Sequence, residues 1–120
     1  MGDYRDLIVF QKAYKLAMDI FELSKKFPSE EKFSLTDQIR RSSRSVCANL
    51  VEAYRRRKYK AHFLSKLTDS DTENAETQIW LDFSKNCKYI TEVQYADLTF
   101  RNEEVGKILW HMIQNPDKFT

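Results

Sequence analysis

Glycine and proline are scarce in this chain, whose 120 residues contain only two of each. Hairpins, Greek keys and phosphate-binding loops depend on these residues for tight turns and positive φ angles. Hydrophobic residues make up 42% of the sequence and charged residues 32%, which is typical of a globular domain rather than a disordered segment. Because this length is that of one domain, we expect a single all-α domain over residues 1–120.

Apolar residues recur at steps of three and four in four stretches of the sequence, which places them on one face of an α-helix in each stretch. Pro28 and Pro116 follow the first and last stretches, where proline stops the helical hydrogen-bond ladder. The predicted helices cover residues 6–27, 35–57, 61–86 and 94–114. Four amphipathic helices joined by short connections predict an antiparallel up-down-up-down four-helix bundle.

Two tryptophans lie at helical spacing beside other apolar residues: Trp80 with Leu81 and Phe83, and Trp110 with Met112. We expect core packing for both groups. Apolar residues would then surround much of the third helix. A helix of that kind is covered on more than one side, which implies self-association.

The charges are distributed unevenly, although the net charge is only +2. Residues 36–68 contain nine Lys or Arg and two Asp or Glu, a local charge of +7, whereas residues 69–90 contain two and five, a charge of −3. A basic block beside an acidic one indicates electrostatic recognition of a partner.

The basic block falls on one flank of the second predicted helix, beside its apolar face, and continues into the following turn. Its candidate partner surface consists of Arg40, Arg41, Arg44, Arg55, Arg56, Arg57, Lys58 and Lys60. Three interpretations stay open. The flank is a solvated face with salt bridges to the acidic third helix, a surface for nucleic-acid phosphates, or a contact with a neighbouring subunit.

A second, polar stripe runs along the same helix at steps of three and four. It comprises Arg41, Ser45, Asn49, Glu52 and Arg56, and the third helix offers Ser70, Glu73 and Thr77 at matching spacing. We interpret the two stripes as an interhelical or intersubunit network that fixes register.

No pattern of catalytic or metal-binding residues is present. Glu73 and Glu76 lack the histidines of a di-metal bundle site, and Cys47 and Cys87 lie forty residues apart without a further ligand at zinc spacing. We therefore expect no enzyme activity, no metal and no cofactor, with buried thiols in a reducing compartment. The first residues are charged and no stretch approaches a membrane span, so a cytoplasmic protein without membrane contact is expected.

The residues from the end of the first predicted helix through the second one follow a recognisable spacing: Phe27-Pro28, Glu31, Leu35, Gln38, Arg40-Arg41, Ser45-Val46, Asn49-Leu50 and Glu52. In this spacing the chain resembles the 23S ribosomal RNA intervening-sequence protein family, whose pattern reads approximately FPxxExFxLxxQxRRxxxSxxxNxxEG. The later stretch from Glu73 through Trp80-Leu81-Asp82-Phe83 to Cys87 is similar to one branch of that family. One residue departs from the pattern: Ala53 stands where the family has glycine. Alanine favours a second helix that continues toward Arg56.

The resemblance implies an antiparallel four-helix bundle that assembles as a homopentamer. It also implies a likeness to the accessory protein of diversity-generating retroelements, a basic barrel associated with a reverse transcriptase and nucleic acid. The first functional hypothesis is thus a non-catalytic oligomeric bundle that binds RNA, DNA or a ribonucleoprotein through the basic flank. The alternative is a homo-oligomeric scaffold or protein–protein adaptor without a nucleic-acid role.

Overall fold

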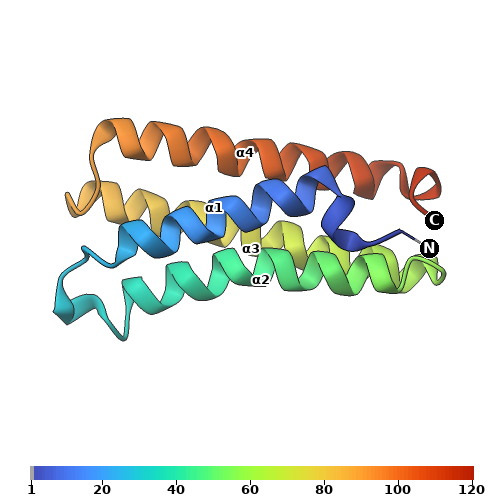
Figure 1. Cartoon of the computed structure of the whole chain (residues 1–120), viewed down its shortest axis with the longest axis horizontal. Helices are drawn as coiled ribbons and strands as arrows, with labels where there is room; N and C mark the ends of the chain where they lie inside the picture. Colours follow the sequence, from blue (N-terminus) through green and yellow to red (C-terminus); the bar gives the residue numbers. More distant parts are fainter. Residues whose placement is uncertain (1) are drawn as a thin grey trace.

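The computed structural model describes residues 2–120, which form four long helices that run alternately in opposite directions (Figure 1). The helices are α1 (Ile8–Ser24), α2 (Leu35–Arg55), α3 (Lys60–Asn86) and α4 (Glu92–Gln114), and single 3-10 turns lie at Tyr4–Asp6, Ser29–Glu31 and Pro116–Lys118. Within residues 2–120 there is no strand. The prediction of an all-α, up-down-up-down bundle is confirmed.

The helix boundaries differ from the predicted ones by up to three residues. α1 is shorter at its beginning because the Asp3 carboxylate accepts a hydrogen bond from the Arg5 backbone N–H at 2.9 Å and closes a separate 3-10 turn. At its end, α1 stops at Ser24, four residues before Pro28. Helix α4 begins earlier than predicted because Thr91 and Gln94 form a reciprocal capping box.

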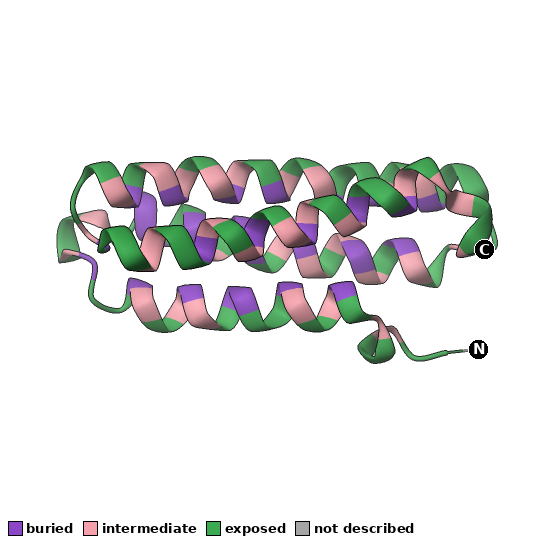
Figure 2. Cartoon of the chain, turned by 90° about the horizontal axis from the view of Figure 1, so that it is seen from above, coloured by how far each residue is buried: buried purple, intermediate pink, exposed green. Residues whose placement is uncertain are grey.

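Each helix packs against two neighbours: α1 against α2 and α4, and α3 against the same two helices. The buried side of each helix faces the axis of the bundle (Figure 2). The turn between α2 and α3 lies at the same end of the molecule as the first described residues and the C-terminus (Figure 1). This end carries the basic residues of the α2–α3 turn that are described below.

The core consists of two apolar clusters with a polar layer between them. Leu50, Phe63 and Leu109 belong to the cluster nearer the α2–α3 turn, and Ile39 and Leu81 belong to the other cluster. All five side chains are at most 1% exposed. Burial of this kind is the main stabilising term of a helical bundle.

Two asparagines form the centre of the polar layer between α3 and α4. The Asn74 side-chain amide donates to Asn102 Oδ1 at 2.8 Å, and the Asn102 amide donates to the Asn74 backbone carbonyl at 3.0 Å. Gly106 leaves room for this pair, since a Cβ atom there would lie 2.8 Å from Asn74 Oδ1. The reciprocal bonds satisfy amides that would otherwise be costly to bury.

The expected core packing is wrong for two of the large side chains. Phe83 is 52% exposed and Trp110 is 56% exposed, whereas Leu81 and Met112 are buried. Each exposed ring is two residues from its buried neighbour, a rotation of about 200° around the helix. That rotation turns the two rings toward the outer surface of the bundle.

Candidate nucleic-acid interface

The basic residues at the end of α2 are presented by a short turn. Helix α2 continues through Arg55, and Ala53, the residue that departs from the family pattern, is fully buried in the core. The Tyr59 N–H donates to the Arg56 carbonyl at 2.8 Å, and the Tyr59 carbonyl accepts from Phe63 N–H as α3 begins. Helix α2 thus reaches the basic residues, as predicted for alanine at position 53.

Two of the eight candidate basic residues, both arginines, attach α1 to α2. The Arg40 Nε atom donates to Ser24 Oγ at 2.7 Å, and its guanidinium carbon lies 4.7 Å from the centre of the Phe21 ring. The Arg44 guanidinium carbon lies 5.4 Å from the same ring. These contacts hold both guanidinium groups over α1, where they contribute to packing.

Two further candidates have partners near the turn. The Arg57 guanidinium donates to the Tyr54 carbonyl at 2.8 Å and stacks at 3.8 Å from the centre of the Tyr54 ring. The Lys60 ammonium forms an ion pair with Asp117 at 3.0 Å. Both cations have local interactions that a polyanion would have to share.

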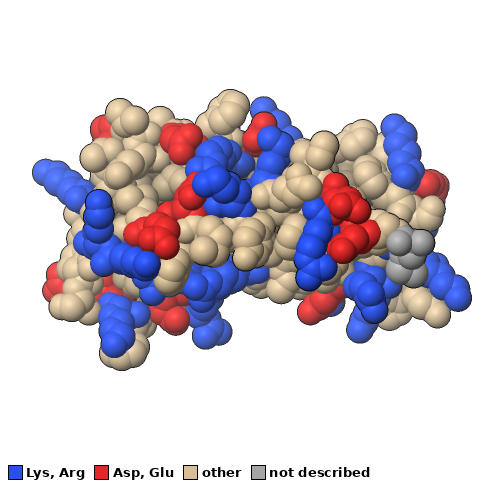
Figure 3. All heavy atoms as spheres, in the orientation of Figure 1, with Lys and Arg blue, Asp and Glu red and all other residues tan. Residues whose placement is uncertain are grey.

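The other four candidates, Arg41, Arg55, Arg56 and Lys58, have exposed side chains. Within the described residues 2–120, none of them forms an ion pair or a side-chain hydrogen bond. Three of them lie at the α2–α3 turn, and Lys and Arg side chains project from this end of the molecule in Figure 3. We call Arg55, Arg56 and Lys58 the turn cations.

Within residues 2–120, no hydrogen bond or ion pair joins the polar stripe of α2 to Ser70, Glu73 or Thr77, and only Glu52 reaches α3. Glu52 forms an ion pair with Lys66 at 2.8 Å, and this lysine lowers the pKa of the Glu52 carboxyl. The Asn49 amide donates to Ser45 within α2, at 3.0 Å to its carbonyl and 3.1 Å to its hydroxyl. Arg41 and Arg56 extend to the surface.

On α3, the predicted partners divide in the same way. Thr77 Oγ1 donates to Ser42 Oγ at 2.8 Å, and Ser70 Oγ donates to the Val46 carbonyl at 2.8 Å, so both hydroxyls are buried against α2. Sequence reasoning missed Ser42 because it lies on the core side of the stripe. An intersubunit pairing of the stripes stays a prediction.

Glu73 differs from the other members of the stripe. Within residues 2–120 its side chain has no hydrogen-bond or ion-pair partner. Burial raises the pKa of its carboxyl, with smaller contributions from the negative charges of Glu76 and Asp69. The carboxylate is therefore destabilising within one subunit.

Sequence reasoning also missed an aromatic pair beside the turn cations. The Tyr59 ring is 58% exposed, and its centre lies 6.0 Å from that of the exposed His62 ring, nearly perpendicular to it. The signal in the sequence is that Tyr59 is the only aromatic residue within the run Arg-Arg-Arg-Lys-Tyr-Lys at 55–60.

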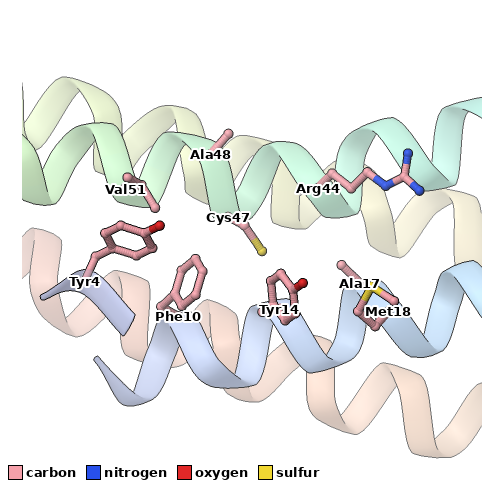
Figure 4. A pocket seen from close by; sticks show the side chains of 9 residues that line it. All are labelled: Tyr4, Phe10, Tyr14, Ala17, Met18, Arg44, Cys47, Ala48 and Val51. Carbon is pink, nitrogen blue, oxygen red and sulfur yellow. The ribbon is translucent and has the colours of Figure 1, made fainter. Parts of the chain in front are cut away.

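An apolar groove with a volume of about 390 Å³ lies between α1 and α2 (Figure 4). Phe10, Tyr14 and Met18 line it from α1, and Cys47 and Val51 line it from α2. Burial raises the pKa of the Cys47 thiol to about 11, which keeps it protonated at neutral pH.

Elsewhere in the described part of the chain, no three His, Cys, Asp or Glu side chains gather as a metal-binding group. No described helix combines the length and the apolar character needed to cross a membrane. Both cysteines are free thiols, but the expected burial is wrong for Cys87, which is exposed directly after α3, whereas Cys47 is half-buried.

The fold and the basic turn define the class of protein: an antiparallel helical bundle with a cationic end. The chain belongs to the 23S rRNA-intervening sequence protein family, whose model matches residues 5–111. The chain is similar to a solved protein of unknown function from the S23 ribosomal protein family of Bacteroides thetaiotaomicron VPI-5482. The two are 33% identical, with a TM-score of 0.82 over 90% of this chain and 96% of the other. The search of curated proteins gives no match. The likeness to the retroelement accessory protein stays a prediction.

Proposed function

We propose that this protein is a non-catalytic helical bundle that binds nucleic acid, alone or within a ribonucleoprotein, through the turn cations Arg55, Arg56 and Lys58. The observation that carries the proposal is that none of the three forms an ion pair within residues 2–120. An unpaired surface cation can contact a phosphate without first breaking an internal ion pair. Guanidinium groups also match the geometry of phosphate oxygens.

The remaining basic candidates have secondary roles in this proposal. Arg41 is exposed and lies nearer the beginning of α2, so it extends the surface that contacts phosphates. Arg40 and Arg44 are held over Phe21 and stabilise the scaffold. Cytoplasmic RNA or DNA is the ligand class, and the free thiols of Cys47 and Cys87 are compatible with that reducing compartment.

The experiment is a fluorescence-anisotropy titration of labelled RNA and DNA at low ionic strength. The wild-type protein is compared with Arg55→Gln/Arg56→Gln and with a control, Lys26→Gln/Lys32→Gln. The control removes two exposed cations near the α1–α2 connection, at the other end of the bundle (Figure 1). We expect the arginine variant to bind more weakly and the control to bind like wild type. Absence of binding by the wild-type protein to either polymer at low salt contradicts the proposal.

A homo-oligomeric scaffold is the second candidate, and the exposed apolar residues favour it. Ile79 and Phe83 lie on the outer side of α3 and are 51% and 52% exposed, and Phe100 of α4 is 67% exposed. Ile79 and Phe83 lie one helical turn apart, and adjacent exposed apolar side chains are typical of interaction sites. A neighbouring subunit could also supply the cation that Glu73 lacks within its own chain. The pentamer implied by the family resemblance belongs to this proposal.

Light scattering at micromolar concentration tests the scaffold. We expect an oligomer for wild type and a smaller particle for Phe83→Glu, because a carboxylate is costly to bury at an interface. The reversals Arg56→Glu and Glu73→Arg, alone and together, test the charge pairing between subunits. Only a paired contact is restored in the double variant. A wild-type monomer contradicts the scaffold and leaves the nucleic-acid proposal intact.

A further inference from the structure

We propose that Tyr59 and His62 form a stacking site for an unpaired nucleobase, so that the polymer bound at the turn cations is single-stranded. This inference rests on the proposed nucleic-acid function and goes beyond it. Phosphate contacts alone do not distinguish a single strand from a duplex, whereas an exposed aromatic ring does. The bases of a duplex already stack on one another, and those of a single strand are free to stack on protein.

The first argument is the geometry of the two rings. Tyr59 is 58% exposed and occupies the position before the first residue of α3, and His62 lies one turn later on the same helix. Their centres are 6.0 Å apart and their planes are inclined by 77°. This T-shaped arrangement holds the two exposed rings against each other at nearly a right angle.

The second argument is the hollow beside the rings. Arg56, Tyr59 and His62 line an open surface cavity of about 210 Å³. One cation and two aromatic rings are thus the entire lining. This composition is that of the single-strand sites in which bases stack on aromatic residues while Arg or Lys contacts the backbone.

The third argument is the position of the charges. The Lys58 ammonium lies 5.8 Å from the centre of the Tyr59 ring, and Arg55 and Arg56 precede it at the end of α2. A base on Tyr59 would place its own backbone phosphates beside these cations. The backbone of the turn is fixed by the Tyr59 N–H bond to the Arg56 carbonyl, at 2.8 Å, so little ordering is needed on binding.

The experiment measures the affinity of each protein variant for a fluorescein-labelled oligo-uridylate strand of about twelve nucleotides and for an RNA duplex of equal length. Tyr59→Leu retains apolar bulk and removes the π-face, and Tyr59→Phe retains the ring. The matched control is Phe33→Leu at the other end of the bundle. The Phe33 ring is 87% exposed and also has a lysine nearby, with Lys32 Nζ 5.3 Å from its centre. Circular dichroism checks that every variant retains its helices.

We expect Tyr59→Leu to bind the single strand about 5- to 100-fold more weakly, with duplex affinity unchanged. Tyr59→Phe and Phe33→Leu should bind the strand like wild type. Unchanged single-strand affinity of Tyr59→Leu, or an equal loss for strand and duplex, overturns the stacking site while the nucleic-acid proposal stands. If wild type binds neither polymer at low salt, both proposals fail.

Discussion

Replacing Asn102 with leucine should destabilise the bundle strongly, because this residue holds the polar layer together. Asn102 is 3% exposed. Asn102→Leu removes the bond from the Asn74 amide to Asn102 Oδ1, at 2.8 Å, and the bonds from the Asn102 amide to the Asn74 carbonyl and to Gln78 Oε1, at 3.0 Å and 3.3 Å. The Asn74 amide keeps its bond to the backbone carbonyl of residue 102, at 3.1 Å.

The cost follows from these three bonds. Each contributes about 1 kcal/mol net, and a buried polar group left without its partner adds a similar amount. Burial of the leucine side chain offsets part of this. We expect a loss of about 2–4 kcal/mol in the free energy of unfolding. For a domain of this size, that loss lowers the melting temperature by roughly 8–15 °C.

Thermal unfolding followed by circular dichroism measures this loss at one fixed protein concentration, because self-association would shift the transition. The control is Asn86→Leu at the exposed last residue of α3, for which we expect a change within about 0.5 kcal/mol. The double variant Asn74→Leu/Asn102→Leu should recover much of the loss, since removing both partners leaves fewer orphaned groups. If Asn102→Leu and the control Asn86→Leu have the same melting temperature, the reasoning about the polar layer is wrong.

Three further predictions concern single residues. Gly106→Ala should lower the melting temperature, because the added Cβ would lie 2.8 Å from Asn74 Oδ1. This clash should outweigh the helix preference of alanine over glycine, which is about 1 kcal/mol. A higher melting temperature refutes the close contact. Glu73→Gln should raise the melting temperature of a monomeric subunit at pH 7. Burial raises the folded-state pKa of Glu73 above its ordinary value of 4.5, so the destabilisation is absent below that value and complete above the folded-state pKa. The gain should therefore vanish near pH 4, and a loss at pH 7 would instead indicate that Glu73 pairs with a neighbouring subunit. Of the two thiols, the exposed Cys87 should react rapidly with a thiol reagent at pH 8. Cys47 should react slowly, because burial raises its pKa to about 11; two equally fast thiols contradict this assignment.

The fold could be predicted from sequence because helical periodicity and the scarcity of glycine and proline each favour long helices. The side that each residue faces was harder to predict. Trp110 and Phe83 are apolar and close to buried residues, yet their angular position turns them outward. Hydrophobicity alone does not determine which way these two side chains face, because the orientation depends on how the neighbouring helices pack.

The candidate site was predicted in part. The sequence placed the basic residues on α2 and its following turn, but it gave no sign that Arg40 bonds to Ser24 and stacks on Phe21. Those partners come from the preceding helix α1, and Ser24 lies 16 residues before Arg40, so only the tertiary structure distinguishes tethered arginines from free ones. The pairing of Tyr59 with His62 is local by contrast, because side chains three positions apart lie next to each other on a helix.

The salt dependence of binding tests the central claim most directly, because each phosphate contact releases counterions. The logarithm of the binding constant for a single strand falls with the logarithm of salt concentration, with a slope of about −0.7 per phosphate contacted. Arg55→Gln/Arg56→Gln/Lys58→Gln should reduce the magnitude of that slope by about 2, one such contribution for each turn cation. A slope equal to that of wild type would contradict the account.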